Sequence, residues 1–254
     1  MSEAPDAVVS LAVGTGRCGT TLLAALAGRE PDVAASHERL RLAATFQLYC
    51  AWYGLPVDPE GFLVDREAAV RVDLASRRVS FEASALLSHA VELLHARLGA
   101  RVLLVVRRPD HTVGSFAVRG WFAAPPVRRD PDRPPSYREG EEPRHFFGRI
   151  LPIGADAVAR FAASTPIGRI AWFWQARNRA ILDQLGRLPA SAVALVRLED
   201  LDFDRYLALA PFLGWRPTVT RAAFDALAAS RPNAGPNLPR LPDRWTDRER
   251  AEFE

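Results

Sequence analysis

The sequence predicts an α/β fold in which helices flank both faces of a parallel β-sheet within a single domain. Two short apolar runs, Val8–Val13 and Arg101–Val106, have the length and β-branched content of buried strands. Segments with apolar residues at helical spacing lie between the candidate strands, and this alternation is typical of a parallel sheet covered on both sides. The chain has 254 residues, a length that one large α/β domain can fill.

The first strand indicates how the fold begins. Val8–Val13 enters a glycine-rich turn, and an Ala/Leu-rich segment that predicts a helix follows at 20–28. Strand, glycine loop and helix in this order are P-loop-like. Further strands are expected at 79–81 and 192–196. Further helices are expected at 40–53, 84–98, from Pro109 onward, and at 156–163, 168–185, 203–213 and 220–229.

Composition limits the class of protein. The net charge of +3 is too small to predict a nucleic-acid partner. No apolar run approaches the roughly 20 residues of a membrane span, and the acidic N-terminus does not predict a secretory signal, so a cytoplasmic location is the default expectation. Two cysteines, Cys18 and Cys50, provide no disulfide framework and no metal cluster.

All 33 basic residues are arginine. This usage is expected of a GC-rich bacterial genome. Its chemical consequence is that any mechanism needing a lysine amine is excluded, including a Walker-type phosphate-binding lysine and a Schiff base.

Two segments stand apart from the predicted elements. Residues at about 123–149 form a Pro- and charge-rich insertion, which we expect to be a solvated loop or a lid over an acceptor pocket. A Pro/Asn/Arg tail covers about 230–254, and we expect it to close over a bound cofactor.

The glycine loop carries the first chemical signal. Gly14 and Gly19 have Walker A spacing, but Thr20 and Thr21 stand where lysine and Ser/Thr are usual. Glycines let successive backbone N–H groups point at an anion, and the helix N-terminus adds positive potential. Arg17 can provide the missing charge in a two-pronged geometry suited to phosphate or sulfate oxygens. The alternative is a tight βα turn without a ligand.

A second signal follows the strand Arg101–Val106. Arg107 lies at its carboxyl end, where open parallel sheets bind ligands. Ser115 comes eight residues later on the helix that Pro109 opens. An arginine and a hydroxyl on the same side of this junction can hold a phosphate, although each residue alone fits an ordinary surface role.

Together these segments resemble the sulfotransferases that use 3′-phosphoadenosine 5′-phosphosulfate (PAPS). G-x-x-R-x-G-T-T-L-L from Gly14 resembles their 5′-phosphosulfate loop, most closely that of the bacterial and tyrosylprotein branches, in which arginine replaces lysine. R-x-P with a serine eight residues after the arginine resembles their 3′-phosphate motif. The stretch from Val196 to Leu201 resembles the R-Y-E-D-L segment, and Trp245 resembles a tryptophan near the C-terminus of many members.

The resemblance implies a role for each matching residue. It implies that PAPS is the co-substrate and adenosine 3′,5′-bisphosphate the product, without a metal. Glu38 matches the acidic residue that acts as base in the tyrosylprotein-like branch, and His37 beside it is the alternative base. Arg107 and Ser115 would bind the 3′-phosphate, and Arg17 would act in catalysis as well as in binding. The residues of the 5′-phosphosulfate loop are Gly16, Arg17, Cys18, Gly19, Thr20 and Thr21.

The chain also departs from the pattern. Cys18 replaces a serine, and we expect it to be a buried loop residue or a redox-active thiol. Leu198 replaces the tyrosine of R-Y-E-D-L, which leaves the adenine contact unassigned. The C-terminal glycine-basic loop of cytosolic members is absent. Its candidate replacements are Arg231, Asn233, Asn237 and Arg240.

Two other kinds of function fit parts of this pattern. One is a nucleotide-dependent kinase with a degenerate P-loop, and the other is a non-catalytic nucleotide-binding module. The sequence leaves the acceptor open among a small molecule, a carbohydrate and a lipid. It does not indicate the oligomeric state. Glu82 is a candidate to line the site, and Ser84 is a candidate helix cap.

Overall fold

A five-stranded parallel sheet organises the computed structural model, which describes residues 7–123, 148–230 and 239–254. Its strand order is β2-β3-β1-β4-β5, and every pairing is parallel. The strands are β1 (Val8–Val13), β2 (Val33–His37), β3 (Val79–Ala83), β4 (Arg101–Val106) and β5 (Val193–Arg197). The predicted parallel α/β architecture is confirmed.

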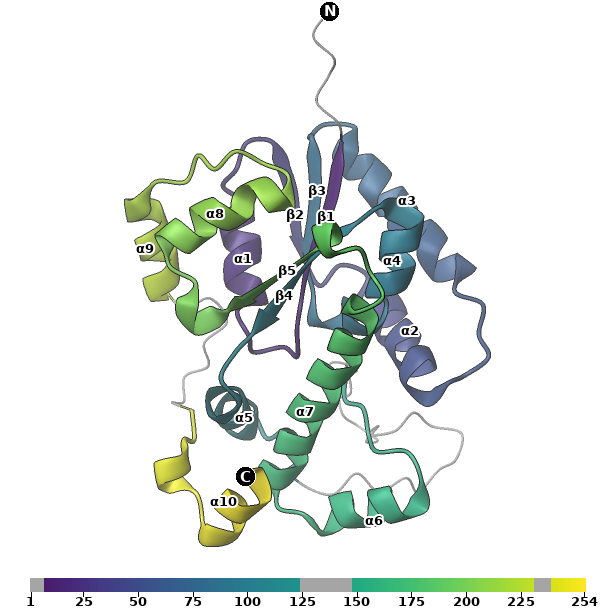
Figure 1. Ribbon diagram of the computed structural model, residues 1–254, viewed down its shortest axis with the longest axis vertical. Coiled ribbons are helices and arrows are strands. Elements are labelled where there is room, and N and C mark those ends of the chain that lie inside the picture. Colours follow the sequence, from purple (N-terminus) through teal and green to yellow (C-terminus); the bar gives the residue numbers. More distant parts are fainter. Residues whose placement is uncertain (1–6, 124–147, 231–238) are drawn as a thin grey trace, which may run out of the picture.

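Helices cover both faces of the sheet (Figure 1). One face packs against α1 (Thr20–Ala27), α8 (Phe203–Leu213) and α9 (Arg221–Ser230). The other packs against α2 (Arg41–Tyr53), α3 (Glu60–Leu74), α4 (Val91–Leu98) and the C-terminal half of α7 (Pro166–Leu185).

Strand β4 shows why its sequence is apolar throughout. Leu103 and Val105 pack into the layer that contains α1, whereas Val102 and Leu104 pack into the layer that contains α4. All four side chains are fully buried. A strand with helices on both sides needs apolar residues at every position, because successive side chains point to opposite faces.

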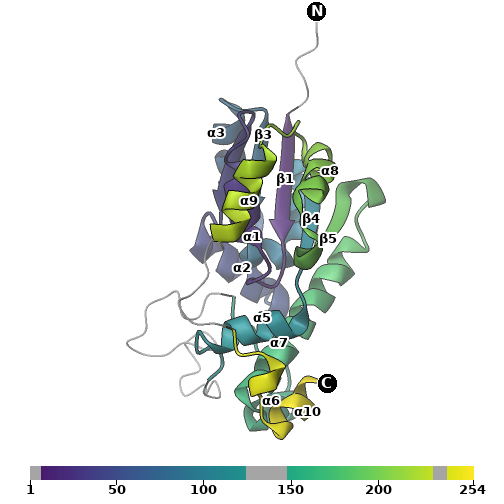
Figure 2. The same cartoon turned by 90° about the vertical axis from the view of Figure 1, so that its left-hand side faces the viewer.

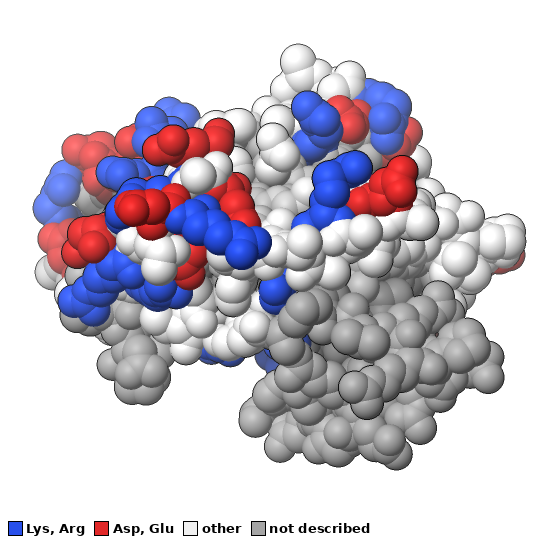
Figure 3. All heavy atoms as spheres, turned by 90° about the horizontal axis from the view of Figure 1, so that it is seen from below, with Lys and Arg blue, Asp and Glu red and all other residues white. Residues whose placement is uncertain are grey.

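A second tier lies beyond the carboxyl ends of the strands (Figure 2). It comprises α5 (Pro109–Ala117), α6 (Ala155–Ala163), the N-terminal half of α7 and α10 (Asp247–Phe253). These elements enclose an aromatic core that includes Phe116, Phe122, Phe161 and Phe173. In the view from below, acidic and basic side chains lie together in separate groups with uncharged surface between them (Figure 3).

Several elements differ from the sequence prediction. Strand β2 and the helices α3 and α10 were not predicted, and the helix expected at 84–98 is interrupted. Its first turn is a 3₁₀-helix, η1 (Ala85–His89), and α4 begins only at Val91. Ser84 caps η1, as one of the alternatives proposed, by accepting a hydrogen bond from the Leu86 N–H at 3.2 Å. The predicted insertion lies, except at its two ends, outside the described residues.

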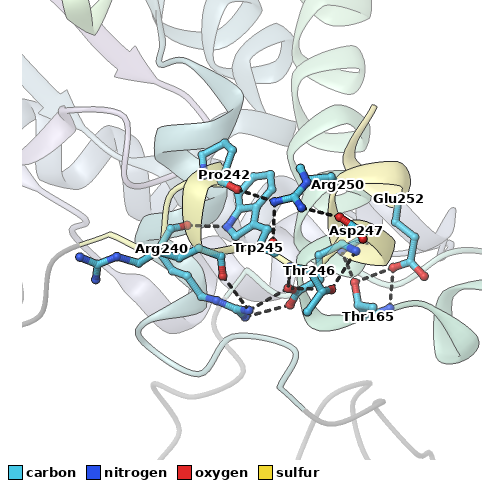
Figure 4. Close-up of polar contacts among 11 residues, drawn as sticks. Thr165, Arg240, Pro242, Trp245, Thr246, Asp247, Arg250 and Glu252 are labelled. Carbon is cyan, nitrogen blue, oxygen red and sulfur yellow. Dashed lines mark hydrogen bonds and ion pairs between the residues drawn. The ribbon is translucent and has the colours of Figure 1, made fainter.

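The C-terminal residues 239–254, here called the C-terminal clasp, join α5 to α7 (Figure 4). Arg240 forms two hydrogen bonds to Glu249, at 2.8 and 2.7 Å, and the Arg240 N–H donates to the Gly114 carbonyl of α5 at 3.3 Å. Glu252 accepts a hydrogen bond of 2.7 Å from the N–H of Thr165, the N-cap of α7.

In the part of the chain that the structure describes, no helix is long and apolar enough to cross a bilayer.

Gly114→Ala tests the contact between the clasp and α5. A Cβ at Gly114 would lie 2.6 Å from the Arg240 carbonyl oxygen. The variant should therefore lose about 1–3 kcal/mol of unfolding free energy, as expected for overpacking. Gly61→Ala in α3 is the matched control, because nothing lies within 4 Å of a Cβ there. Urea denaturation measures both variants, and equal stabilities would contradict the close contact.

Candidate functional site

The candidate site is centred on the loop between β1 and α1, at the carboxyl edge of the sheet. Gly14 and Gly19, the glycines at its two ends, lie too close to neighbouring atoms to carry a side chain. A Cβ at Gly14 would lie 2.5 Å from the Val105 carbonyl oxygen of β4. Gly19 has a φ of +103°, and a Cβ there would lie 2.5 Å from Leu198 Cδ1. The loop therefore takes this shape only with glycine at both positions.

The loop ends at the N-terminus of α1. Gly19 is the N-cap, no side chain caps the helix, and its first turn carries no acidic residue. The N–H groups of a first helical turn have no intrahelical partner and carry a partial positive charge. This end of α1 is suited to an anion.

Arg17 connects the loop to the second predicted motif. Its backbone is left-handed, with a φ of 56°. The Arg17 Nε donates a hydrogen bond to Ser115 Oγ at 3.0 Å, and Arg107 Nη1 donates to the Arg17 carbonyl at 3.1 Å. Three residues that the sequence placed in two separate motifs are thus in direct contact.

The positive charges of the site act on one another. Burial, followed by the charges of Arg119 and Arg107, lowers the pKa of Arg17 to about 10, so Arg17 stays protonated at neutral pH. The Glu38 carboxylate opposes this shift. Mutual repulsion among three guanidinium groups favours a bound anion among them. Sequence reasoning missed Arg119, which lies in the turn that follows α5, just beyond the C-cap Val118.

The end of β2 brings in the two candidate bases. His37 Nε2 lies 3.2 Å from Thr21 Oγ1 and 3.4 Å from Thr20 Oγ1. The pKa of His37 is lowered overall, because burial disfavours its charged form and the neighbouring Glu38 carboxylate opposes this only in part. The Glu38 N–H donates to the Ala83 carbonyl at 3.1 Å. Its carboxylate lies 3.6 Å from Arg41 Nε.

Cys18 is fully buried inside the loop, and burial raises the pKa of its thiol. A buried, protonated thiol is a poor nucleophile. This favours the packing alternative over the redox one. Among the described residues, no group of three or more His, Cys, Asp or Glu side chains could hold a metal ion.

The remaining residues that the sequence analysis named have other surroundings. The Arg240 guanidinium is paired with Glu249 in the C-terminal clasp, and its assignment to the cofactor stays a prediction. Arg231, Asn233 and Asn237 fall outside the described residues. Leu198 packs directly on the loop at Gly19. The Glu82 carboxylate is buried and paired with Arg66 at 2.8 Å.

Arg177 of α7 is a further residue that the sequence did not single out. Its side chain is 1% exposed and donates to the carbonyls of Gly148, at 3.2 Å, and Ala85. Burial lowers the pKa of Arg177 to about 10, and the nearby Tyr49, Cys18 and Glu38 oppose that shift. Nothing in the local pattern of an amphipathic helix distinguishes such a residue from an exposed arginine.

Comparison with solved structures identifies the fold. A sulfotransferase domain from the curacin biosynthetic pathway superposes with a TM-score of 0.51 at 13% identity, covering 99% of this chain and 97% of that domain. The sulfotransferase STF9 from Mycobacterium avium superposes with a TM-score of 0.52 at 13% identity, covering 91% of this chain and 70% of that one. No protein-family model matches the sequence, and no curated protein matches it significantly. The chain has the fold of these sulfotransferases.

Gly19→Ala tests how tightly Leu198 packs on the loop. Left-handed strain plus the Leu198 contact should lower the unfolding free energy by about 2–4 kcal/mol. Gly120→Ala is the matched control: φ is +71° there, but nothing lies within 4 Å of a Cβ, so only the strain applies. Adding Leu198→Ala to Gly19→Ala should recover part of the loss. Urea denaturation measures all three, and equal losses at both glycines would argue against the contact.

Proposed function

We propose that this chain is a sulfotransferase that takes a sulfuryl group from PAPS. The observation that carries the proposal is the direct contact of Arg17 with Ser115 and Arg107. It joins a phosphosulfate-type loop to a 3′-phosphate-type motif at adjacent strand ends, in a chain with a sulfotransferase fold.

The two ends of the donor would occupy the two halves of this junction. The 5′-phosphosulfate would lie at the N-terminus of α1, held by Arg17 and by backbone N–H groups from Gly16 and from Cys18 to Thr21. The 3′-phosphate would take the hydroxyl of Ser115 and the guanidinium of Arg107. An anion at this junction would also offset the repulsion that lowers the pKa of Arg17.

Transfer would then proceed in line. The S–O bond to the 5′-phosphate breaks as a new S–O or S–N bond forms to the acceptor, and negative charge grows on the departing phosphate oxygen. Arg17 and the N–H groups of the loop would stabilise that charge, and positioning would supply most of the remaining catalysis. The acceptor proton would pass to the base. We expect the acceptor to be a hydroxyl or amine of a small molecule, a carbohydrate or a lipid.

Geometry favours Glu38 over His37 as this base. The His37 Nε2 is occupied by the hydroxyls of Thr20 and Thr21, so His37 is suited to orienting the loop. The Glu38 side chain is 26% exposed, and its charge acts on Arg17, which supports a carboxylate close to the residue that would hold the transferring group.

Arg107→Ala should weaken binding of adenosine 3′,5′-bisphosphate by about 1.5–3 kcal/mol, the range of a hydrogen bond to a charged group. Arg108→Ala is the matched control, because Arg108 is exposed and paired with Asp110 at 2.7 Å. Isothermal titration calorimetry measures both dissociation constants. An Arg107 variant that binds as tightly as the wild type would rule out this assignment.

Glu38→Gln should slow transfer from labelled PAPS by about 10²–10⁴-fold, because the amide cannot accept the acceptor proton. Its affinity for adenosine 3′,5′-bisphosphate should stay within about twofold of the wild type. Glu92→Gln removes an exposed carboxylate, paired with Arg187 at 2.7 Å, and serves as control. Near-normal turnover of Glu38→Gln would transfer the role of base to another group.

A further inference from the structure

The chain leaves β2 in an unusual backbone conformation. Glu38 and Leu40 both have positive φ, at 50° and 53°, and neither is a glycine. Side chains crowd the backbone in this region, so such residues persist only where the surrounding structure fixes them. The turn that presents the proposed base therefore needs something to hold it.

A buried ion pair holds this turn at Arg39, the residue between Glu38 and Leu40. Arg66 of α3 is 3% exposed, and its Nη2 donates to the Arg39 carbonyl at 2.8 Å. Glu82 of β3 is 7% exposed, and its Oε1 accepts from the Arg39 N–H at 3.0 Å. Arg66 Nη1 and Glu82 Oε2 pair at 2.8 Å. We call this arrangement the Arg66–Glu82 clamp, since it binds both polar groups of the Arg39 backbone.

The register of the sheet brings Glu82 to this point. Ser36 of β2 lies opposite Glu82 of β3, and His37 lies opposite Ala83. The Glu38 N–H still donates to the Ala83 carbonyl at 3.1 Å, which makes it the last ladder contact before the turn. The first residue after Glu38 is the one that the clamp binds.

Stability alone gives no reason for such a pair. Burying two charges costs desolvation that their attraction scarcely repays, and apolar residues of similar volume often stabilise a fold as well or better. A pair that also bonds a strained backbone segment does something that apolar residues cannot do, because it defines the direction of the chain.

We propose that the Arg66–Glu82 clamp positions Glu38 for proton transfer, and that Arg66 and Glu82 are positioning residues of the reaction. The inference rests on the proposed role of Glu38 as base. Neither residue would contact the donor or the acceptor; both would act through the backbone at Arg39.

Glu82→Leu and the double variant Arg66→Met/Glu82→Leu test the clamp, because leucine cannot accept the hydrogen bond from the Arg39 N–H. The double variant leaves no unpaired buried charge, so it is the one suited to folding without the clamp. Arg97→Gln is the matched control, because it removes an exposed arginine that pairs with Glu67 of α3 at 2.9 Å. Three quantities are measured: turnover of labelled PAPS, with water or the best acceptor from a panel of phenols, sugars and fatty alcohols; affinity for adenosine 3′,5′-bisphosphate; and amide hydrogen exchange of residues 37–44.

We expect both clamp variants to lose about 10–100-fold in turnover, as displacement of a catalytic group by about 1 Å can cause. Exchange at 37–44 should accelerate, while the bisphosphate affinity and exchange in α1 stay at wild-type values. In the Glu38→Gln background the clamp variants should cause no further loss, because a group already removed cannot be misplaced.

Three results would each overturn the inference. They are wild-type turnover in the double variant, unchanged hydrogen exchange at 37–44, and a loss of turnover in the Glu38→Gln background as large as in the wild-type background. Failure of the proposed function looks different: the wild-type protein would then neither bind the bisphosphate nor turn over PAPS. Hydrogen exchange would still decide whether the clamp holds the turn.

Discussion

The hydrogen bond from Arg17 Nε to Ser115 Oγ is the contact on which the candidate site depends. It closes only because β1 and β4 are neighbours in a parallel sheet, so their carboxyl ends open onto the same edge. Gly14 lets the loop approach β4 closely enough, and the C-terminal clasp packs on Gly114, next to Ser115. Sheet order, loop glycines and the chain terminus thus all act on one junction.

Charge divides the site into two sides. On the side of β1 and β4, burial and then the charges of Arg119 and Arg107 disfavour the charged form of Arg17, and a bound anion would offset this. On the side of β2, a carboxylate stands on a left-handed turn held by an internal pair of opposite charges. A site that gathers an anionic donor and accepts a proton needs both kinds of environment, and the fold keeps them apart on different strands.

What the sequence allowed us to predict follows from how local each signal is. Strands β1 and β4 were found because helices on both faces make their sequences continuously apolar. Strand β2, with the sequence VAASH, lies at the edge of the sheet and, among the described strands, pairs with β3 alone. Helix α3 buries little beyond Phe62, Leu63 and Arg66, so neither pattern stands out. Motif spacing singled out Arg17, Arg107 and Ser115. Arg66 and Arg177 were missed because a buried arginine is distinguished only by partners distant in sequence, such as Glu82 and the Ala85 carbonyl.

The central claim is that this junction binds two phosphate groups of one adenine nucleotide without a metal. Calorimetric titration of the wild-type chain with adenosine 3′,5′-bisphosphate and with ATP, each in the presence of EDTA, tests it most directly. The account predicts a dissociation constant on the order of micromolar for the bisphosphate, equivalent to about 8 kcal/mol, and much weaker binding of ATP. ATP binding as tight as that of the bisphosphate, or no binding of the bisphosphate, would contradict it.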